Sequence, residues 1–75
     1  MREPIDILKS YSGKEVTVNC KKGFDFKGTL LLVDDNNNIL LGNCTILRGE
    51  TEEKTNNSSL INGQNITHIQ LNKTS

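Results

Sequence analysis

The stretch FDFKGTLLLVD, residues 24–34, most narrows the folds that are open to this chain. Its aromatic and branched residues predict a long β-strand, and Gly28 lies inside it. A glycine within a strand often marks a sharp bend. Because a long bent strand makes an antiparallel sheet curl, the sequence predicts a small open barrel rather than a flat sheet.

Four shorter strands accompany this bent strand. Each is bounded by polar turn residues, and the first alternates apolar and polar side chains as a half-buried strand does. Between the last two lies Asn62-Gly63, a strong hairpin signal in which Gly63 is expected to need a positive φ. The four strands are predicted over residues 15–20, 38–47, 59–61 and 64–71.

Two further segments complete the prediction. Residues 3–11 are expected to form a short helix, because Pro4 suits the first helical position and Gly13 ends it. The polar residues 48–58 are expected to form a variable loop. The predicted fold class is therefore all-β, with a short N-terminal helix followed by a strongly bent five-stranded antiparallel sheet, all within one domain of residues 1–75.

The small size of the chain predicts self-assembly. A domain of this length buries only roughly 60 % of its unfolded surface, so its core needs support from a disulfide, a metal or a partner subunit. Cys20 and Cys44 allow at most one bridge, and His68 is the only histidine, so neither a disulfide framework nor a metal site is expected. The free edge strands of an open barrel, residues 59–61 and 64–71, are expected to pair between copies instead.

Composition excludes several classes of function. The net charge is zero, which rules out a generally basic surface. No stretch approaches the roughly 18 apolar residues of a membrane helix, and no secretory signal is visible, so an intracellular protein is expected. The sequence contains no recognisable nucleophile–base pair, phosphate loop or carboxylate pair, so neither catalysis nor a cofactor is expected.

Two motifs resemble those of the Sm/LSm family. Residues 13–41, GKEVTVNCKKGFDFKGTLLLVDDNNNILL, resemble the first Sm motif, and residues 60–71, LINGQNITHIQL, resemble the second. The Y-K-H turn of the bacterial Hfq branch is absent, so the resemblance is to the archaeal and eukaryotic branches. It implies a ring, commonly of seven subunits, with two loops of each subunit at the central pore.

The resemblance also implies a function in RNA processing, mRNA splicing, RNA stability or ribonucleoprotein assembly, through binding of short single-stranded, uridine-rich RNA. In the family an aromatic residue stacks on the base, an Asn reads its edge, an Arg packs against it and an Asp orients the loop. By position these roles fall to Asn36, Asn38, Asn62 and Asp34, with Gly63 as the family's glycine and Asn37 in place of a Met. Such a protein works in the cytoplasm, the nucleus or both, and in the cytoplasm if it is archaeal.

Three alternatives accompany this interpretation. Asn36 replaces the stacking aromatic and Asn62 replaces the Arg, so the chain is alternatively an assembly subunit with a degenerate RNA pocket that closes a heteromeric ring. Asp and Asn also favour turns for purely structural reasons, so residues 34–38 are alternatively only a turn. A calcium loop over the same residues is rejected, because Ile39 stands where the glycine of an EF-hand is required.

Overall fold

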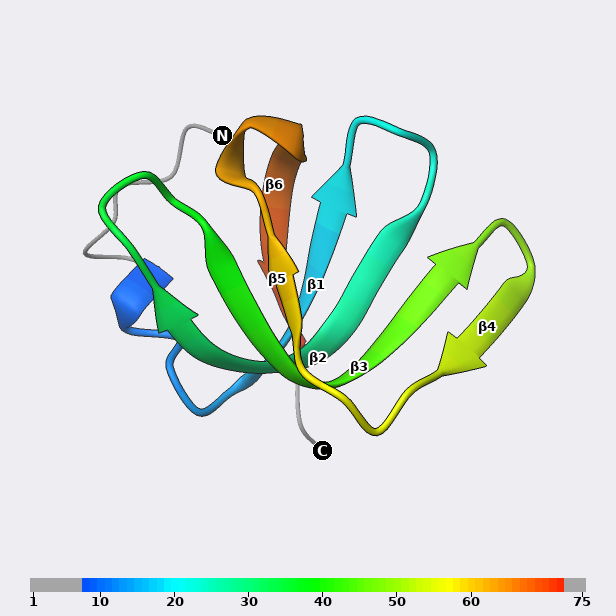
Figure 1. Ribbon diagram of the computed structural model, residues 1–75, viewed down its shortest axis with the longest axis horizontal. Helices are drawn as coiled ribbons and strands as arrows, with labels where there is room; N and C mark the ends of the chain where they lie inside the picture. Colours follow the sequence, from blue (N-terminus) through cyan, green and yellow to red (C-terminus); the bar gives the residue numbers. More distant parts are fainter. Residues whose placement is uncertain (1–7, 73–75) are drawn as a thin grey trace.

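A computed structural model describes residues 8–72 of the chain, and its fold is a single strongly bent sheet (Figure 1). All strand pairs are antiparallel, in the order β4-β3-β2-β1-β6. β5 pairs with the first residues of β3, whereas β4 pairs with its last residues. The strands are β1 (Glu15–Cys20), β2 (Asp25–Val33), β3 (Ile39–Arg48), β4 (Thr51–Lys54), β5 (Ser59–Ile61) and β6 (Ile66–Leu71), and a 3-10 helix, η1 (Gly63–Asn65), precedes β6.

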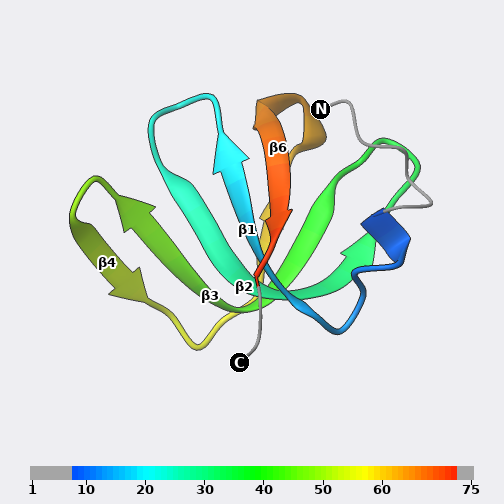
Figure 2. The same cartoon turned by 180° about the vertical axis from the view of Figure 1, so that it is seen from behind.

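The predicted bend of the long second strand is confirmed. β2 curves through the middle of the molecule in both views (Figures 1 and 2), and its pairing with β3 shifts register between Lys27 and Thr29. A Cβ atom at Gly28 would lie 2.7 Å from the carbonyl oxygen of Gly42, closer than van der Waals contact allows. Glycine therefore lets β2 and β3 approach each other where the sheet turns most sharply.

The core lies inside the curl of the sheet and is entirely apolar. In β1 alternate residues point inward, so Val16 and Val18 are fully buried while Glu15 is exposed. Both cysteines are buried free thiols that pack with this core. The buried apolar residues are Leu8, Val16, Val18, Cys20, Leu30, Val33, Ile39, Leu41, Cys44, Ile61, Ile66 and Ile69.

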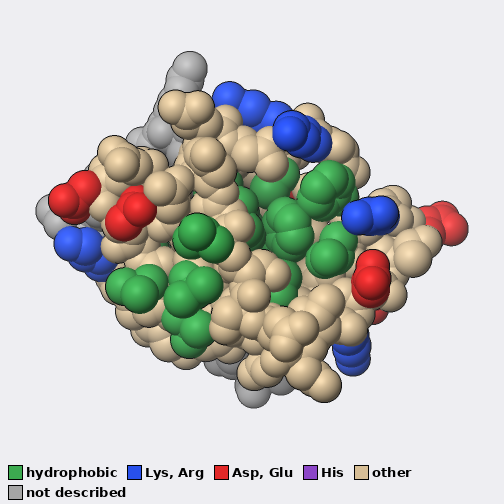
Figure 3. Space-filling model, viewed as in Figure 1, with side chains coloured by type: hydrophobic (Ala, Val, Ile, Leu, Met, Phe, Trp, Pro, Cys, Tyr) green, Lys and Arg blue, Asp and Glu red, His purple; other side chains and the backbone are tan. Residues whose placement is uncertain are grey.

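Four leucines remain at the surface of the chain. Leu60 in β5 is 75 % exposed and Leu32 in β2 is 62 % exposed, and Leu31 and Leu71 are also exposed. Figure 3 shows apolar side chains at the surface over β2, β3 and β5. Exposed apolar side chains that lie together are candidates for contact with a partner.

The prediction of a loop over all of residues 48–58 is wrong. Residues 51–54 form β4, which pairs with residues 45–48 of β3 through a two-residue turn. Gly49 has a φ of +58°, as the first residue of such a tight turn requires. All four side chains of β4 are exposed, so no apolar alternation reveals the strand, and the sheet has six strands rather than five.

The predicted hairpin at Asn62-Gly63 is also wrong. β5 pairs with β3 whereas β6 pairs with β1, so the two strands that flank this dipeptide are not partners. Asn62 keeps a φ of −69°, because its side chain caps η1 instead of entering the left-handed region. Gly63 is not among the described glycines with positive φ, so the expected reason for this glycine is wrong.

Most of the helix predicted over residues 3–11 lies outside the described residues. Within them, Leu8 and Lys9 are helical, and turns follow that are closed by bonds such as Tyr11 N–H to Leu8 O at 3.0 Å. Gly13 has a φ of +82° and ends this segment as predicted. The part of the chain that is described contains no helix long and apolar enough to cross a membrane.

Candidate nucleic-acid interface

The carboxylate of Asp34 organises the turn between β2 and β3. Its Oδ1 accepts hydrogen bonds from the backbone N–H groups of Asn36 and Asn38, each at 2.9 Å. Its Oδ2 accepts a third from Asn38 Nδ2, also at 2.9 Å. These bonds, led by the backbone N–H of Asn38, hold the pKa of Asp34 below its ordinary value, so the carboxylate stays charged.

Asparagine suits the tip of this turn for a local reason. Asn37 has a φ of +62°, a conformation that asparagine tolerates better than most residues, and its backbone N–H donates to Asp34 O at 3.0 Å. The structural interpretation of residues 34–38 as a turn is therefore correct. It leaves open a binding role for the side chain of Asn36, which is exposed, and for the remaining hydrogen-bonding capacity of Asn38, whose amide also bonds within the chain.

The segment between β5 and β6 is shaped by Asn62. The side-chain Oδ1 of Asn62 accepts a hydrogen bond from the backbone N–H of Gln64 at 2.9 Å, which is the bond of a helix N-cap. The backbone N–H of Asn65 donates to Asn62 O at 3.0 Å and closes η1. The side chain of Asn62 thus keeps its amide nitrogen available while its oxygen is used.

Asn38 joins these two segments, which are far apart in the sequence. Its Oδ1 accepts a hydrogen bond from the backbone N–H of Gly63 at 2.8 Å. The approach is so close that a Cβ atom at Gly63 would lie 2.6 Å from the carbonyl oxygen of Asn36 and 2.7 Å from that of Asn37. Gly63 is therefore required for close backbone packing, which replaces the positive φ that the sequence suggested.

An amide-lined hollow opens where the two segments meet. It has a volume of about 400 Å³ and is lined by Asn36, Asn38, Asn62 and Gln64. The side chains of Asn36 and Gln64 make no hydrogen bond within residues 8–72. Each offers one acceptor and two donors, a set that can pair with the edge of an unstacked base.

The structure brings all five sequence-predicted site residues together. Asp34 orients Asn38, Asn38 binds Gly63, and Asn36 and Asn62 line the hollow. Sequence reasoning missed Gln64, which follows the Asn-Gly pair directly but was assigned to a strand. The signal was present: a cap residue at Asn62 predicts that the next residues form a helical turn rather than a strand.

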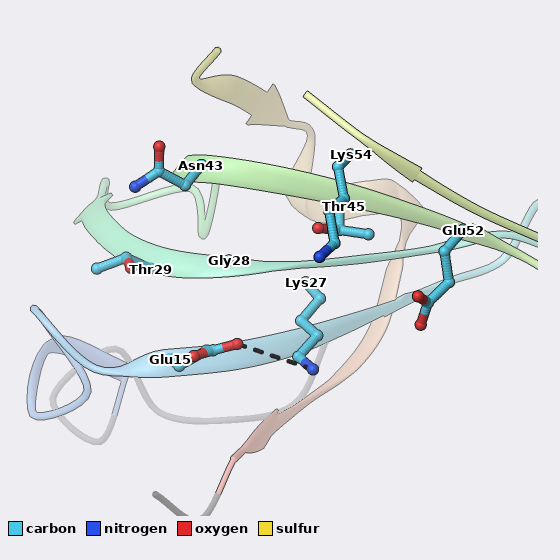
Figure 4. A pocket seen from close by; sticks show the side chains of 8 residues that line it. All are labelled: Glu15, Lys27, Gly28, Thr29, Asn43, Thr45, Glu52 and Lys54. Carbon is cyan, nitrogen blue, oxygen red and sulfur yellow. Dashed lines mark ion pairs between the residues drawn. The ribbon is translucent and has the colours of Figure 1, made fainter. Parts of the chain in front are cut away.

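A second polar hollow lies on the face of the sheet opposite the core, around Gly28 (Figure 4). It has a volume of about 360 Å³, and its lining contains two lysines and two glutamates. Glu15 and Lys27 form an ion pair of 3.8 Å across it. Because its charges balance, this hollow offers no net attraction to an RNA backbone, and the amide-lined hollow is the better candidate.

Comparisons with known proteins agree on one family. The model of the LSM domain matches residues 6–71. An Sm-like protein of Pyrococcus furiosus is 33 % identical over 66 residues, which cover 88 % of this chain and 87 % of that protein.

Solved structures show the same fold. The Pyrococcus abyssi Sm protein, solved in complex with a uridine heptamer, has a TM-score of 0.86 at 28 % identity and covers 95 % of this chain and 100 % of its own. A heptameric Sm protein of Pyrobaculum aerophilum shares the fold, with a TM-score of 0.85 at 22 % identity and 92 % of each chain covered. The chain therefore belongs to the LSM-domain family of Sm-like proteins.

Proposed function

We propose that this chain is a single Sm-like domain that forms a ring and binds single-stranded, uridine-rich RNA at residues 34–38 and 62–65. The observation that carries the proposal is the Asn38–Gly63 hydrogen bond, which joins two distant segments around a hollow lined by amides. The P. abyssi relative was solved with a uridine heptamer, which supports the same ligand here. Such binding serves RNA processing, RNA stability or ribonucleoprotein assembly.

The chemistry of the hollow fits an unpaired uracil. The edge of uracil presents carbonyl acceptors on either side of an N–H donor, and carboxamides supply both complementary groups. No aromatic side chain lines the hollow, so each subunit lacks the stacking that contributes about 1–3 kcal/mol per base. Several copies around one pore would compensate, because linked sites bind a continuous strand together.

The edges of the sheet support a ring. β5 and β6 each pair on one side only within the described chain, which leaves backbone donors and acceptors for another subunit. Leu60 on β5 and Leu71 on β6 are exposed apolar side chains on these edges. We propose that β5 of one subunit pairs with β6 of the next, in a ring of seven copies or of sister Sm-like subunits.

The test removes amides that have no structural bond. In an Asn36→Ala/Gln64→Ala double variant we expect oligo-uridine to bind more weakly by about 1–3 kcal/mol per subunit used, measured by fluorescence anisotropy at one fixed salt concentration. Asn57→Ala, in the distant connection before β5, is the matched control and should bind as the parent does. Equal affinity of the double variant and the parent would contradict the proposal.

A second function is favoured by the lining of the hollow. Asn36 and Asn62 occupy the positions of the family's aromatic and Arg, and neither supplies a ring or a cation. These residues suit an assembly subunit that closes a heteromeric ring and leaves RNA binding to its neighbours. Native mass spectrometry of the purified chain decides between the two, because an assembly subunit alone would not form a closed ring.

The same proposal gives the protein no catalytic role and a place inside the cell. The four amides of the hollow neither ionise near neutral pH nor act as nucleophiles, so the site can bind but not cleave. Cys20 and Cys44 are free thiols, which is the usual state of cysteines in a reducing cytoplasm.

A further inference from the structure

A third hollow adjoins the amide-lined one, and lysines line it. It has a volume of about 430 Å³ and is lined by Lys21, Lys22, Asn62, Gln64 and Asn65. Asn62 and Gln64 line both hollows, so the two are separated only by these side chains. A ligand large enough to occupy both hollows would lie over Asn62 and Gln64 and reach the lysines.

The lysines are held in place by the backbone. They lie in the turn between β1 and β2, where Gly23 has a φ of +86°. The backbone N–H of Lys21 donates to Asn65 O at 2.8 Å, which fastens this turn to η1. The Cys20–Ile66 pairing of β1 with β6 lies beside it. The backbone from which the two lysines extend is thus fixed relative to the amides.

Within residues 8–72 no carboxylate pairs with these lysines. The ion pair found there joins Lys27 to Glu15 and involves neither Lys21 nor Lys22. Asp25, the acidic residue nearest to them in sequence, uses Oδ2 to accept from Asn19 Nδ2 at 3.0 Å and Oδ1 to accept from Cys20 N at 3.1 Å. In a chain without net charge, two adjacent ammonium groups that have no ion-pair partner among the described residues make a local site for an anion.

We propose that Lys21 and Lys22 form a phosphate-binding subsite for the RNA backbone, next to the hollow that holds the base. One nucleotide then places its base among Asn36, Asn38 and Gln64 and its phosphate at the lysines. The two groups differ in chemistry: amides form hydrogen bonds with a base edge, and ammonium groups neutralise phosphate charge whatever the sequence. This inference rests on the proposed RNA-binding function.

The experiment measures how RNA affinity depends on salt. Fluorescence anisotropy is recorded with oligo-uridine and oligo-adenosine, from about 50 to 200 mM salt, for the parent and for Lys21→Gln/Lys22→Gln. The slope of log K against log salt should fall by about 0.7 for each phosphate contact that is lost per strand. Affinity at the lowest salt should fall on the order of tenfold for both oligomers, because phosphate contacts act alike on every sequence.

Two controls separate a subsite from a general charge effect. Lys14→Gln/Lys54→Gln removes the same charge from exposed lysines that line neither the amide-lined hollow nor the hollow of Lys21 and Lys22. This variant should keep the parent's slope. Lys21→Arg/Lys22→Arg keeps both charges and should also retain it. The oligomeric state of each variant is measured alongside, so that a change in assembly is not read as a change in binding.

The possible results are distinct. If Lys21→Gln/Lys22→Gln keeps the parent's slope while Asn36→Ala/Gln64→Ala weakens binding, the phosphate subsite is wrong and the proposed function stands. If the lysine variant loses affinity for oligo-uridine alone, the lysines read the base and the inference is equally wrong. If the parent binds neither oligomer at any salt concentration, both the function and the subsite are wrong.

Discussion

At the level of single residues, Asn38 is central to the candidate site because both ends of its amide are used inside the chain. Its nitrogen donates to Asp34 and its oxygen accepts from Gly63. The importance of Asp34, Asn38 and Gly63 was predictable from the sequence, since two motifs in order point to them. The bond between Asn38 and Gly63 was not predictable, because it depends on the pairing of β5 with β3 and of β6 with β1.

Replacement of Asn38 should therefore affect stability as well as RNA binding. Asn38→Ala leaves the partly buried N–H of Gly63 without an acceptor, which costs about 1–3 kcal/mol. Urea unfolding should show this loss, and Asn36→Ala, whose side chain makes no such bond, is the matched control. A variant at Asn38 as stable as the parent would mean that the two segments stay together without this bond.

Acid should release the turn at Asp34. Because hydrogen bonds lower the folded pKa of Asp34 below its ordinary value, its contribution to stability is fully present above that ordinary value. That contribution is lost as the pH falls through the lower, folded pKa. NMR should show the backbone amide signals of Asn36 and Asn38 move together in this range. In Asp34→Asn they should not, and an identical acid response in that variant would exclude Asp34 as the cause.

At the level of elements, strands with one face buried in the core can be predicted from the sequence, and strands with both faces exposed cannot. β1, β2 and β3 were placed nearly to their ends, because their apolar residues repeat or run together. β4 was missed because its four exposed residues, TEEK, hold their place by backbone pairing with β3 alone. η1 was missed because Asn-Gly is a stronger signal for a hairpin than Asn is for a cap.

The bend in β2 gives a prediction about Gly28. A Cβ there meets the backbone oxygen of Gly42 at 2.7 Å, and backbone cannot move aside cheaply, so Gly28→Ala should lower the free energy of unfolding by about 1–3 kcal/mol. Gly42→Ala is the matched control, since its Cβ would meet the flexible end of Leu31 at 3.0 Å. Equal destabilisation by both variants in urea would show that the bend does not depend on Gly28.

At the level of the whole molecule, the described strands β4, β5 and β6 each pair on one side only, and four leucines are exposed. The core contains only apolar side chains, and exposed leucines lie on β2, β5 and β6. Self-assembly is an expectation that follows from the length of the chain alone. Which edges remain free required the pairing of β5 with β3 and of β6 with β1.

A charge at one edge should open the ring. Leu60 is 75 % exposed on β5, so Leu60→Glu should leave the fold intact while it places a carboxylate in the proposed contact with the next subunit. Native mass spectrometry should show a closed ring for the parent and small species for Leu60→Glu. Asn57→Glu adds the same charge nearby and should still assemble. If the parent is monomeric at micromolar concentration and folded by circular dichroism, self-assembly through these edges is wrong.

The hydrogen bond from Gly63 to Asn38 also bears on how the protein ages. Asn-Gly pairs are prone to deamidation, in which the backbone nitrogen of the glycine attacks Cγ of the asparagine side chain, ammonia leaves and a cyclic imide forms. Here the N–H of Gly63 donates to Asn38 and the Oδ1 of Asn62 accepts from Gln64 N–H, so the attacking nitrogen and the side chain it would attack are both fixed by other bonds. We therefore expect Asn62 to deamidate more slowly in the folded chain than in the unfolded one, and loosening of the two segments would expose the protein to slow chemical damage at Asn62.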